Sequence, residues 1–412
     1  MHANLDASGN GGSELRAMIG RSRHELTTPA LLLDLPVVRR NILRMAVRTR
    51  GPTRLRPHVK SHKSAEIARM QIEAGAIGLT AATVWEAAAM AAAGMDELLI
   101  ANEVVGEEKL RCLAEIARNT HVTVAVDHVR NADALSAAAG VVGTKIGVLI
   151  DVDVGLRRCG VRSQREARVL AEQVHQLPGL NLRGVMGYEG HCALEPDREA
   201  RAASVRTAME RLLAVADVLR SAGFPVEVVS AGGTGTFDLT GCYPGVTELQ
   251  AGSYVFMDSS RVDLVPDFET GLTVLATVAS RHRNTVVLDC GKKTVGVDFA
   301  PPRIVGQTAK VRYVSEEHTV FDVDSDCGLE LGQRVELIPS YCPTTINLHD
   351  IFYVVRDGVV IDIWPVLARG PGRGGWHEQV FRQSGARNGV GAGDRTSDGR
   401  AVCGGGGEGV RP

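Results

Sequence analysis

Between residues 27 and 235, short apolar runs rich in β-branched residues alternate with longer segments rich in alanine and leucine. Such alternation is typical of βα units, in which each strand of a parallel sheet is followed by a helix. Eight strand-then-helix units in about 210 residues predict an α/β fold, a (β/α)8 barrel of the TIM type. The eight runs are ALLLDL (30–35), LRPHVK (55–60), AIGLTAA (76–82), ELLIA (97–101), VTVAVD (122–127), KIGVLIDV (145–152), LRGVMGYE (182–189) and VEVVSAGG (226–233).

The pattern changes after about residue 265, where strand-like runs follow one another without intervening helices. One of them, IFYVVRDGVVIDIWPVL, carries RDG between two alternating apolar runs, which predicts a β-hairpin. We therefore expect a smaller all-β domain after the barrel. The predicted division is a partly disordered N-terminal segment (1–25), the barrel (26–262), the β domain (263–369) and a disordered glycine-rich tail (370–412).

Composition limits the partners of this chain. The formal net charge of -2 leaves no excess of Lys and Arg to neutralise phosphates, so we expect no nucleic-acid partner. The sequence contains no run of about 18 apolar residues and no apolar signal segment at its start, so neither a membrane nor export is expected. The eight cysteines lie far apart without a CxxC pair, which is typical of reduced thiols in the cytoplasm.

The segment RPHVKSHKS (56–64) places Lys60 at the carboxyl end of the second predicted strand. Barrel enzymes act at these strand ends. In a partly dry barrel mouth, and close to other cations, the neutral form of a lysine amine is favoured, and this form attacks aldehydes. The alternative interpretation is a solvated basic turn, and the residues alone leave both open.

The run SAGGTGT (230–236) follows the eighth predicted strand, where barrels commonly build phosphate sites from backbone N–H groups. A short glycine cluster by itself is most often a turn. Together with Lys60 it indicates a phosphate-bearing aldehyde cofactor, pyridoxal phosphate. Other strand ends bring further side chains to the same rim, namely Arg157, Arg158, Tyr188, Glu189 and His191.

Eight motifs together resemble a known family. They are RPHVKSHK, GLRRCGV, GYEGH, SAGGTGT, ELQAGSYVFMD, LDCGKK, SEEH and PSYCPTTINLHD, in this order. Over residues 28–370 the chain resembles the fold-type III pyridoxal-phosphate enzymes of the D-threonine aldolase and D-serine dehydratase family. The resemblance implies an alanine-racemase-like barrel with a β domain. It also implies a homodimer in which the β domain of one subunit completes the barrel mouth of the other.

The resemblance implies roles for individual residues. Lys60 would bond to the cofactor and move the substrate proton. Arg158 would lie near the phenolic oxygen of the cofactor and Tyr188 beside its ring, and His58 would be a further cofactor contact. The implied phosphate contacts are Gly233, Thr234, Gly235, Thr236, Ser253 and Tyr254.

One motif departs from the family pattern. Before NLHD, the family carries a histidine and, two residues later, a cysteine or aspartate that bind a divalent metal ion. Counting back from Asn347 places Tyr341 and Pro343 at these positions. Proline offers no side-chain ligand and neutral tyrosine is a poor one, so the usual site is absent unless a one-residue shift lets Cys342 serve. Whether a divalent metal binds stays open, and Tyr341 and His191 become candidate acid–base residues.

The expected function is that of a pyridoxal-phosphate-dependent lyase acting on a small D-configured β-hydroxy amino acid, with retro-aldol cleavage to glycine and an aldehyde as the leading reaction. Dehydration and deamination of D-serine or D-3-hydroxyaspartate is the main alternative, because an acid in the same place helps hydroxide to leave. An amino-acid racemase would move only the α-proton. A further alternative is a pyridoxal-phosphate-binding homeostasis protein with little catalysis, but such a protein would not need the second domain. The last alternative is a barrel that does not bind this cofactor.

Overall fold

The computed structural model describes residues 14–370, which belong to one compact unit. The predicted disorder of residues 1–13 and 371–412 lies outside the described residues. Eight parallel strands form one sheet in the order β2-β9-β8-β7-β6-β5-β4-β3. They are β2 (Arg54–Leu55), β3 (Leu79–Ala81), β4 (Glu97–Glu103), β5 (His121–Val126), β6 (Ile146–Asp151), β7 (Leu180–Gly187), β8 (Val228–Ala231) and β9 (Glu248–Leu249).

The two outer strands of this order, β2 and β3, also meet. The Thr80 N–H donates to Pro57 O at 2.8 Å, and the Ile77 N–H donates to Leu55 O at 2.9 Å. An isolated parallel bridge joins His58 to Thr80. The sheet therefore closes on itself, and the predicted eight-stranded parallel barrel is confirmed.

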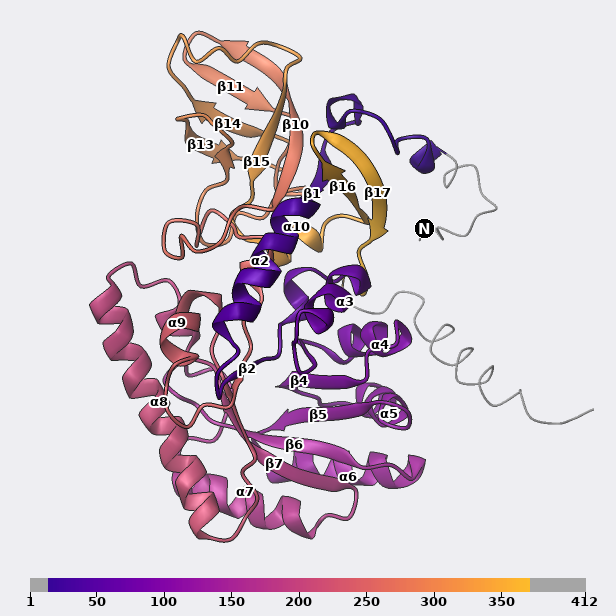
Figure 1. Ribbon diagram of the computed structural model, residues 1–412, viewed down its shortest axis with the longest axis vertical. Coiled ribbons are helices and arrows are strands. Elements are labelled where there is room, and N and C mark those ends of the chain that lie inside the picture. The colour runs from indigo at the N-terminus through magenta and orange to yellow at the C-terminus, as the bar shows by residue number, and fades with distance from the viewer. Residues whose placement is uncertain (1–13, 371–412) are drawn as a thin grey trace, which may run out of the picture. The chain divides into compact units, whose positions relative to one another are not determined.

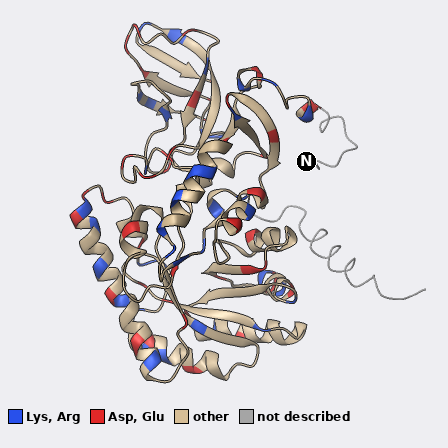
Figure 2. Ribbon diagram, in the orientation of Figure 1, with Lys and Arg blue, Asp and Glu red and all other residues tan. Residues whose placement is uncertain are grey.

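Helices follow the barrel strands because the intervening segments begin with capping residues. The side chains of Ser64, Thr83, Ser163 and Asp197 each accept a hydrogen bond from a backbone N–H in the first turn of the next helix. Basic and acidic residues are interspersed along the outer helices α7 and α8, as a solvated outer surface requires (Figure 2). The helices are α3 (Ala65–Glu73), α4 (Val84–Ala92), α5 (Glu107–Ile116), α6 (Val129–Val142), α7 (Gln164–Gln176), α8 (Arg198–Ser221) and α9 (Phe237–Thr240).

The run expected to open the barrel lies elsewhere. It forms β1 (Ala30–Asp34), which pairs antiparallel with β10 (Leu272–His282) and parallel with β16 (Ile351–Arg356) (Figure 1). The placement of residues 30–35 as the first barrel strand is therefore wrong. The eighth strand is instead β9, and Lys60 follows the first barrel strand. A continuous apolar run fits a buried strand in either sheet, so the sequence alone did not distinguish the two.

The second sheet has nine strands, and β1 lies between β10 and β16. The predicted hairpin is confirmed. Its turn residues Asp357 and Gly358 have φ of 50° and 79°, and Arg356 pairs with Val359 across it. The other strands are β11 (Thr285–Leu288), β12 (Arg303–Ile304), β13 (Lys310–Val314), β14 (Thr319–Asp322), β15 (Arg334–Ile338) and β17 (Val359–Pro365).

The barrel and the second sheet share one apolar core. It includes Leu55 and Ile67 from the barrel together with Leu33 and Phe352 from the second sheet. Helix α2 (Leu35–Arg48) follows β1 directly, and its Asn41 donates hydrogen bonds to Val255 O and Glu269 O. This shared packing holds segments of the second sheet close to the barrel mouth.

The described part of the N-terminal segment is ordered. It contains a short 3-10 helix, η1 (Arg23–Glu25), and the Arg23 N–H donates to Gly358 O at 2.9 Å. The Arg23 guanidinium also pairs with Glu336 at 3.0 Å. Within residues 14–370, no helix combines the length and apolar character needed to cross a bilayer. The seven cysteines in this part of the chain are all free thiols.

Candidate active site

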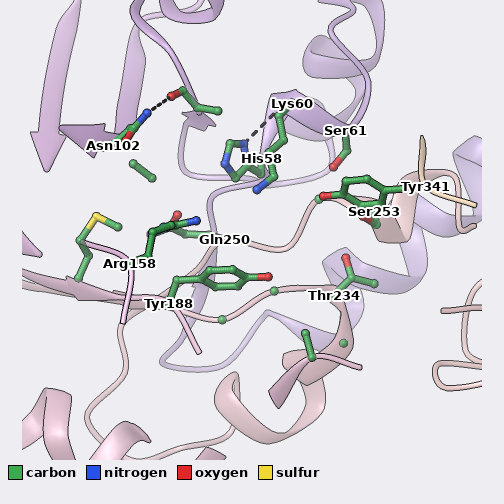
Figure 3. Close-up of a pocket in the computed structure, with 18 of the residues that line it drawn as sticks. His58, Lys60, Ser61, Asn102, Arg158, Tyr188, Thr234, Gln250, Ser253 and Tyr341 are labelled. Atoms are coloured by element: carbon green, nitrogen blue, oxygen red, sulfur yellow. Dashed lines mark hydrogen bonds between the residues drawn. The ribbon is translucent and has the colours of Figure 1, made fainter. Parts of the chain in front are cut away.

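A cavity of about 270 Å³ lies at the carboxyl ends of the barrel strands. It brings together most of the residues that the sequence predicts for the site (Figure 3). Tyr341 reaches the cavity from the C-terminal part of the chain, which forms the second sheet. It lies just before the short helix α10 (Cys342–Ile346). The predicted residues that line the cavity are His58, Lys60, Arg158, Tyr188, Gly233, Thr234, Gly235, Ser253 and Tyr341.

Lys60 reaches the cavity from the short 3-10 helix η2 (Val59–Ser61). His58 precedes this helix, and its Nδ1 accepts a hydrogen bond of 3.4 Å from the Lys60 N–H. Burial, and next the positive charges of Arg158 and Arg261, lower the pKa of Lys60 to about 8, although Glu86 acts in the opposite direction. The amine is thus close to deprotonation near neutral pH, as a lysine that bonds to an aldehyde requires.

The other basic residues of RPHVKSHKS are buried, so the interpretation as a solvated basic turn is wrong. Arg56 pairs with Glu248 at 2.8 Å, and Lys63 pairs with Glu86 at 2.6 Å. The ring of His62 is bonded to Gln71 at 3.2 Å. These contacts fix the backbone on both sides of Lys60. They direct Lys60, rather than its basic neighbours, into the cavity.

Tyr188 and Arg158 border the amine of Lys60. Lys60 Nζ lies 5.9 Å from the centroid of the Tyr188 ring, and the Arg158 guanidinium carbon lies at the same distance from it. Burial, followed by the nearby Glu189 carboxylate, raises the pKa of Tyr188, so its hydroxyl stays neutral. Arg158 is exposed within the open mouth, where its charge is available to an anionic group.

Two short 3-10 helices, η4 (Thr234–Thr236) and η5 (Ser253–Val255), present their N-termini to the cavity. The N–H groups of Thr234, Gly235 and Ser253 donate to no acceptor among residues 14–370. A Cβ at Gly235 would lie 2.1 Å from Ala193 O, and one at Gly252 would lie 2.4 Å from Ser61 Oγ. Glycine at these two positions therefore lets the loops pack closely against Ala193 and Ser61.

Glu189 holds the glycine-rich loop in shape. Its carboxylate is fully buried and accepts hydrogen bonds from the Gly232 N–H, from Thr236 Oγ1 and from Thr240 Oγ1, at 3.1, 2.6 and 2.5 Å. The Thr236 hydroxyl is thus bonded to Glu189, and Thr236 is not among the residues that line the cavity, so its contact with a phosphate stays a prediction. It acts on the loop through Glu189.

Tyr254 also lies behind the wall of the cavity. Its side chain is fully buried, and its hydroxyl accepts a hydrogen bond of 2.8 Å from Gln71 Nε2. Its N–H donates to Thr234 Oγ1 at 2.9 Å, which ties η5 to η4. The structure thus places Tyr254 as a support for the cradle, not as a part of its lining.

His191 does not reach the cavity. It lies in the 3-10 helix η3 (Gly190–Cys192), its side chain is exposed, and the next inward-facing residue of this segment is Ala193. The sequence placed it at the rim because it follows β7 closely. The imidazole is exposed on η3 and does not line the cavity, so a catalytic role for His191 stays a prediction.

Tyr341 and Cys342, in the segment that departs from the family pattern, lie in different surroundings. Tyr341 lines the cavity, and burial raises the pKa of its phenol to about 12. Cys342 is fully buried, and its thiol donates to Met257 O at 3.2 Å. Cys342 therefore does not provide a ligand to the cavity, and the one-residue shift gains no support from its position.

One group of potential metal ligands adjoins the cavity. Within residues 14–370, ligand atoms of Glu103, Asp127 and Cys159 all lie within 4.8 Å of one another. Nearby, burial and the charge of Glu103 raise the pKa of Asp151 to about 8. Burial, with the Glu103 carboxylate next, raises the pKa of the Cys159 thiol to about 11. No spacing pattern along the chain indicates this group.

Sequence reasoning missed several lining residues, namely Ser61, Asn102, Cys159, Gln250 and Arg261. Asn102 is the penultimate residue of β4 and Gln250 directly follows β9, so a search of every strand end would have found both. The Ser61 hydroxyl is fully buried without a hydrogen-bond partner, although it borders the cavity. Its adjacency to Lys60 was the available signal.

This donor set fits pyridoxal phosphate. Lys60 would bond to the aldehyde, and Arg158 would face the phenolic oxygen. The unpaired N–H groups of Thr234, Gly235 and Ser253, with the unpartnered Ser61 hydroxyl, match the several acceptor oxygens of a phosphate group. A buried polar atom without a partner is costly, so a ligand oxygen at Ser61 would also remove an energetic penalty.

Comparison with known proteins decides the family. Residues 33–260 match the family "Alanine racemase, N-terminal domain", and residues 271–355 match "Putative serine dehydratase domain". The chain belongs to the fold-type III family of pyridoxal-phosphate enzymes. The predicted family and its alanine-racemase-like architecture are therefore confirmed.

Individual relatives cover most of the chain. It is 40% identical over 351 residues to D-threonine aldolase of Arthrobacter sp., covering 83% of this chain and 93% of that protein. It is 35% identical over 390 residues to 3-hydroxy-D-aspartate aldolase of Paracoccus denitrificans, covering 90% and 100%. The crystal structure of D-threonine aldolase from Filomicrobium marinum superposes with a TM-score of 0.82 at 36% identity, covering 85% of this chain and 98% of that chain. These members of the family are lyases.

Proposed function

We propose that the chain is a pyridoxal-phosphate-dependent lyase that cleaves a D-configured β-hydroxy amino acid into glycine and an aldehyde. The observation that carries the proposal is the position of Lys60, whose pKa is lowered to about 8 and whose amine enters the same cavity as the unpaired N–H groups of η4 and η5. The similarity to D-threonine aldolase and to 3-hydroxy-D-aspartate aldolase supports the choice of reaction.

When bound, the cofactor supplies an electron sink for the bond that breaks at the substrate α-carbon. The chain's own residues provide the remaining parts. The Lys60 amine lies in the cavity and would be placed to move a proton at the substrate α-carbon. Arg158 is available to stabilise negative charge on the phenolic oxygen. Tyr188 lies beside both groups, and its ring covers this side of the cavity.

Tyr341 is the described residue best placed to act on the β-hydroxyl. Because burial raises the pKa of its phenol to about 12, the hydroxyl stays protonated at neutral pH. A neutral phenol could take the β-hydroxyl proton only by passing its own proton at the same time to a water or a neighbouring group, so that it stays neutral throughout. It would take the place that the family gives to a metal ligand, since the residue two positions later is Pro343.

The same phenol favours dehydration as a second candidate. A group that stays protonated is a proton donor, and dehydration needs a proton for the departing hydroxide. The products distinguish the two reactions, because dehydration and deamination yield ammonia and a keto acid instead of glycine. A homodimer and a cytoplasmic location stay predictions.

The test is a product assay with the holoenzyme. D-threonine, D-serine, D-3-hydroxyaspartate and their L-enantiomers are incubated with the protein, with and without EDTA and added Mn2+. We expect glycine and an equal amount of aldehyde from a D-substrate. The Lys60→Ala variant should be inactive, whereas Lys293→Ala, which removes a surface lysine paired with Glu317, should match the parent chain. Ammonia with a keto acid would favour dehydration, interconversion of enantiomers would favour a racemase, and the absence of any product would contradict the lyase.

A further inference from the structure

Arg261 is a cavity residue to which neither the family resemblance nor the sequence motifs gave a role. It follows the segment that carries Ser253, and its side chain is more than nine-tenths buried while lining the cavity. Its Nη1 donates to both carboxylate oxygens of Asp258 at 3.2 Å and to Ser260 Oγ at 2.7 Å. Asp258 is fully buried, so this contact anchors one corner of the guanidinium.

The rest of the guanidinium is available for binding. Among residues 14–370, no acceptor receives a hydrogen bond from Arg261 Nε or Nη2, and neither nitrogen is sealed from the cavity as a buried unpartnered atom. The guanidinium carbon lies 5.0 Å from the centroid of the Tyr341 ring and 5.9 Å from that of Phe299. Two aromatic rings and one ion pair therefore fix the plane, which leaves two donors in a fork that suits a carboxylate.

Asp258 pairs with one nitrogen of Arg261, and the described lining of the cavity offers no anion to the other two. The lining contains the cations Lys60, Arg158 and Arg261 but no Asp or Glu side chain. The proposed cofactor would use the first two, and backbone N–H groups would hold its phosphate. A β-hydroxy amino acid brings at least one carboxylate, which has to be satisfied when it enters a partly dry cavity.

The position of Arg261 in the cavity also points to a substrate carboxylate as its partner. Arg261 is near enough to Lys60 for its charge to lower the pKa of the amine. Lys60 and Arg261 line the same cavity, so a substrate whose nitrogen lies near the Lys60 amine would bring the groups on its adjacent carbon toward the guanidinium. Tyr341, stacked on Arg261, would face the neighbouring β-carbon.

We propose that Arg261 binds a carboxylate of the amino-acid substrate through its Nε and Nη2 donors, with Asp258 and Tyr341 holding the guanidinium in place. The inference rests on the proposed function. The carboxylate comes from the α-carbon of any substrate of this class, or from the β-carbon of a dicarboxylic substrate such as 3-hydroxyaspartate. Loss of the charge-assisted contact should weaken binding about 10- to 100-fold.

The test titrates the holoenzyme with three ligands that carry no β-hydroxyl, and follows the change in the visible spectrum of the cofactor. D-alanine has one carboxylate, D-aspartate has two, and D-alaninamide has the amine but no carboxylate. We expect Arg261→Gln to raise the Kd of D-alanine about 10- to 100-fold while the Kd of D-alaninamide stays within about twofold. The control Arg303→Gln, which removes a half-exposed arginine paired with Asp263, should leave all three values unchanged.

The pattern of Kd changes among the three ligands shows which carboxylate, if any, Arg261 binds. Equal weakening for D-alanine and D-aspartate assigns Arg261 to the α-carboxylate, and weakening for D-aspartate alone assigns it to the side-chain carboxylate. Unchanged Kd values for both acids, or equal weakening of D-alaninamide, would overturn the inference. If Arg261→Gln does not fold, Arg261→Lys is tested instead, because lysine keeps a cation beside Asp258 but lacks the fork of two donors. The Kd values of Arg261→Lys should change in the same order of ligands, with a smaller effect. Unchanged Kd values in this variant would also overturn the inference. A parent protein whose spectrum does not respond to any of the amines would instead contradict the proposed function.

Discussion

Glu189 Oε1 accepts a hydrogen bond of 2.6 Å from Thr236 Oγ1 and so links the end of β7 to the glycine-rich loop after β8. The other carboxylate oxygen receives the Gly232 N–H. A single buried carboxylate thus sets the position of the loop whose N–H groups face the cavity. The phosphate cradle depends on a residue that does not line it.

Glu189→Gln should loosen this loop. The amide NH2 of glutamine would replace one acceptor oxygen of Glu189 and would face a donor. At least one hydrogen bond to a charged group is therefore lost, which costs about 1.5–3 kcal/mol of stability. We expect a lower Tm of the apoprotein and a weaker affinity for pyridoxal phosphate, both measured by thermal unfolding with and without the cofactor. Glu195→Gln, an alteration at a partly buried carboxylate outside the cavity, serves as the control. An unaltered Tm and affinity would show that the loop is held by other contacts.

The ion pair of Arg56 and Glu248 should contribute to closure of the barrel. Their side chains are only 6% exposed, and they join the segment after β2 to β9. Arg56→Met leaves the Glu248 carboxylate buried without its partner, and we expect a loss of about 3–5 kcal/mol in the free energy of unfolding. Urea unfolding measures the loss. The double variant Arg56→Met/Glu248→Met should recover part of it, and a double variant as unstable as the single one would contradict the charge-based explanation.

Cofactor capture by the apoprotein should depend on pH through Lys60. With a pKa lowered to about 8, the amine is a protonated cation below that pH and the reactive neutral amine above it. The rate of covalent capture should therefore rise about tenfold per pH unit well below the pKa and level off above pH 8, whereas an ordinary lysine would continue to rise to about pH 10.4. Stopped-flow absorbance measures the rate. A profile without a midpoint near pH 8 would contradict the lowered pKa.

Tyr341→Phe should reduce turnover without preventing cofactor binding. The substitution keeps the ring that stacks on Arg261 and removes only the hydroxyl. If the phenol handles the β-hydroxyl proton, kcat should fall about 10²- to 10⁴-fold, the range typical of a positioned acid–base group. Steady-state kinetics and the visible spectrum are measured in parallel. Unchanged kcat with an intact spectrum would leave Tyr341 a space-filling role.

Much of the fold was predictable because its signals are local. Alternating strand and helix patterns and the RDG turn depend on neighbouring residues, and both predictions were confirmed. The position of β1 was not predictable, since a buried strand has the same apolar run in either sheet. Strand β9, with only Glu248 and Leu249, is too short to produce a periodic signal.

Some residues of the candidate site were likewise predictable from the local sequence, and others were not. Lys60 and the glycine-rich loop follow directly after strands, so sequence position was enough to bring them to one rim. His191 also follows a strand, but its imidazole is exposed and does not line the cavity. Arg261 enters the cavity through its anchor on Asp258, a contact between irregular segments that no periodicity encodes. Side-chain direction in such segments is set by tertiary packing.

The central claim is that Lys60 is the residue that bonds to the cofactor. The protein is mixed with pyridoxal phosphate, treated with borohydride, digested and examined by peptide mass spectrometry. The mass of one reduced pyridoxyl phosphate group should appear on the peptide at Lys60, with Lys63 and Lys292 unmodified and with no label in Lys60→Ala. A label at a different lysine, or a protein that takes up no label, would contradict the account.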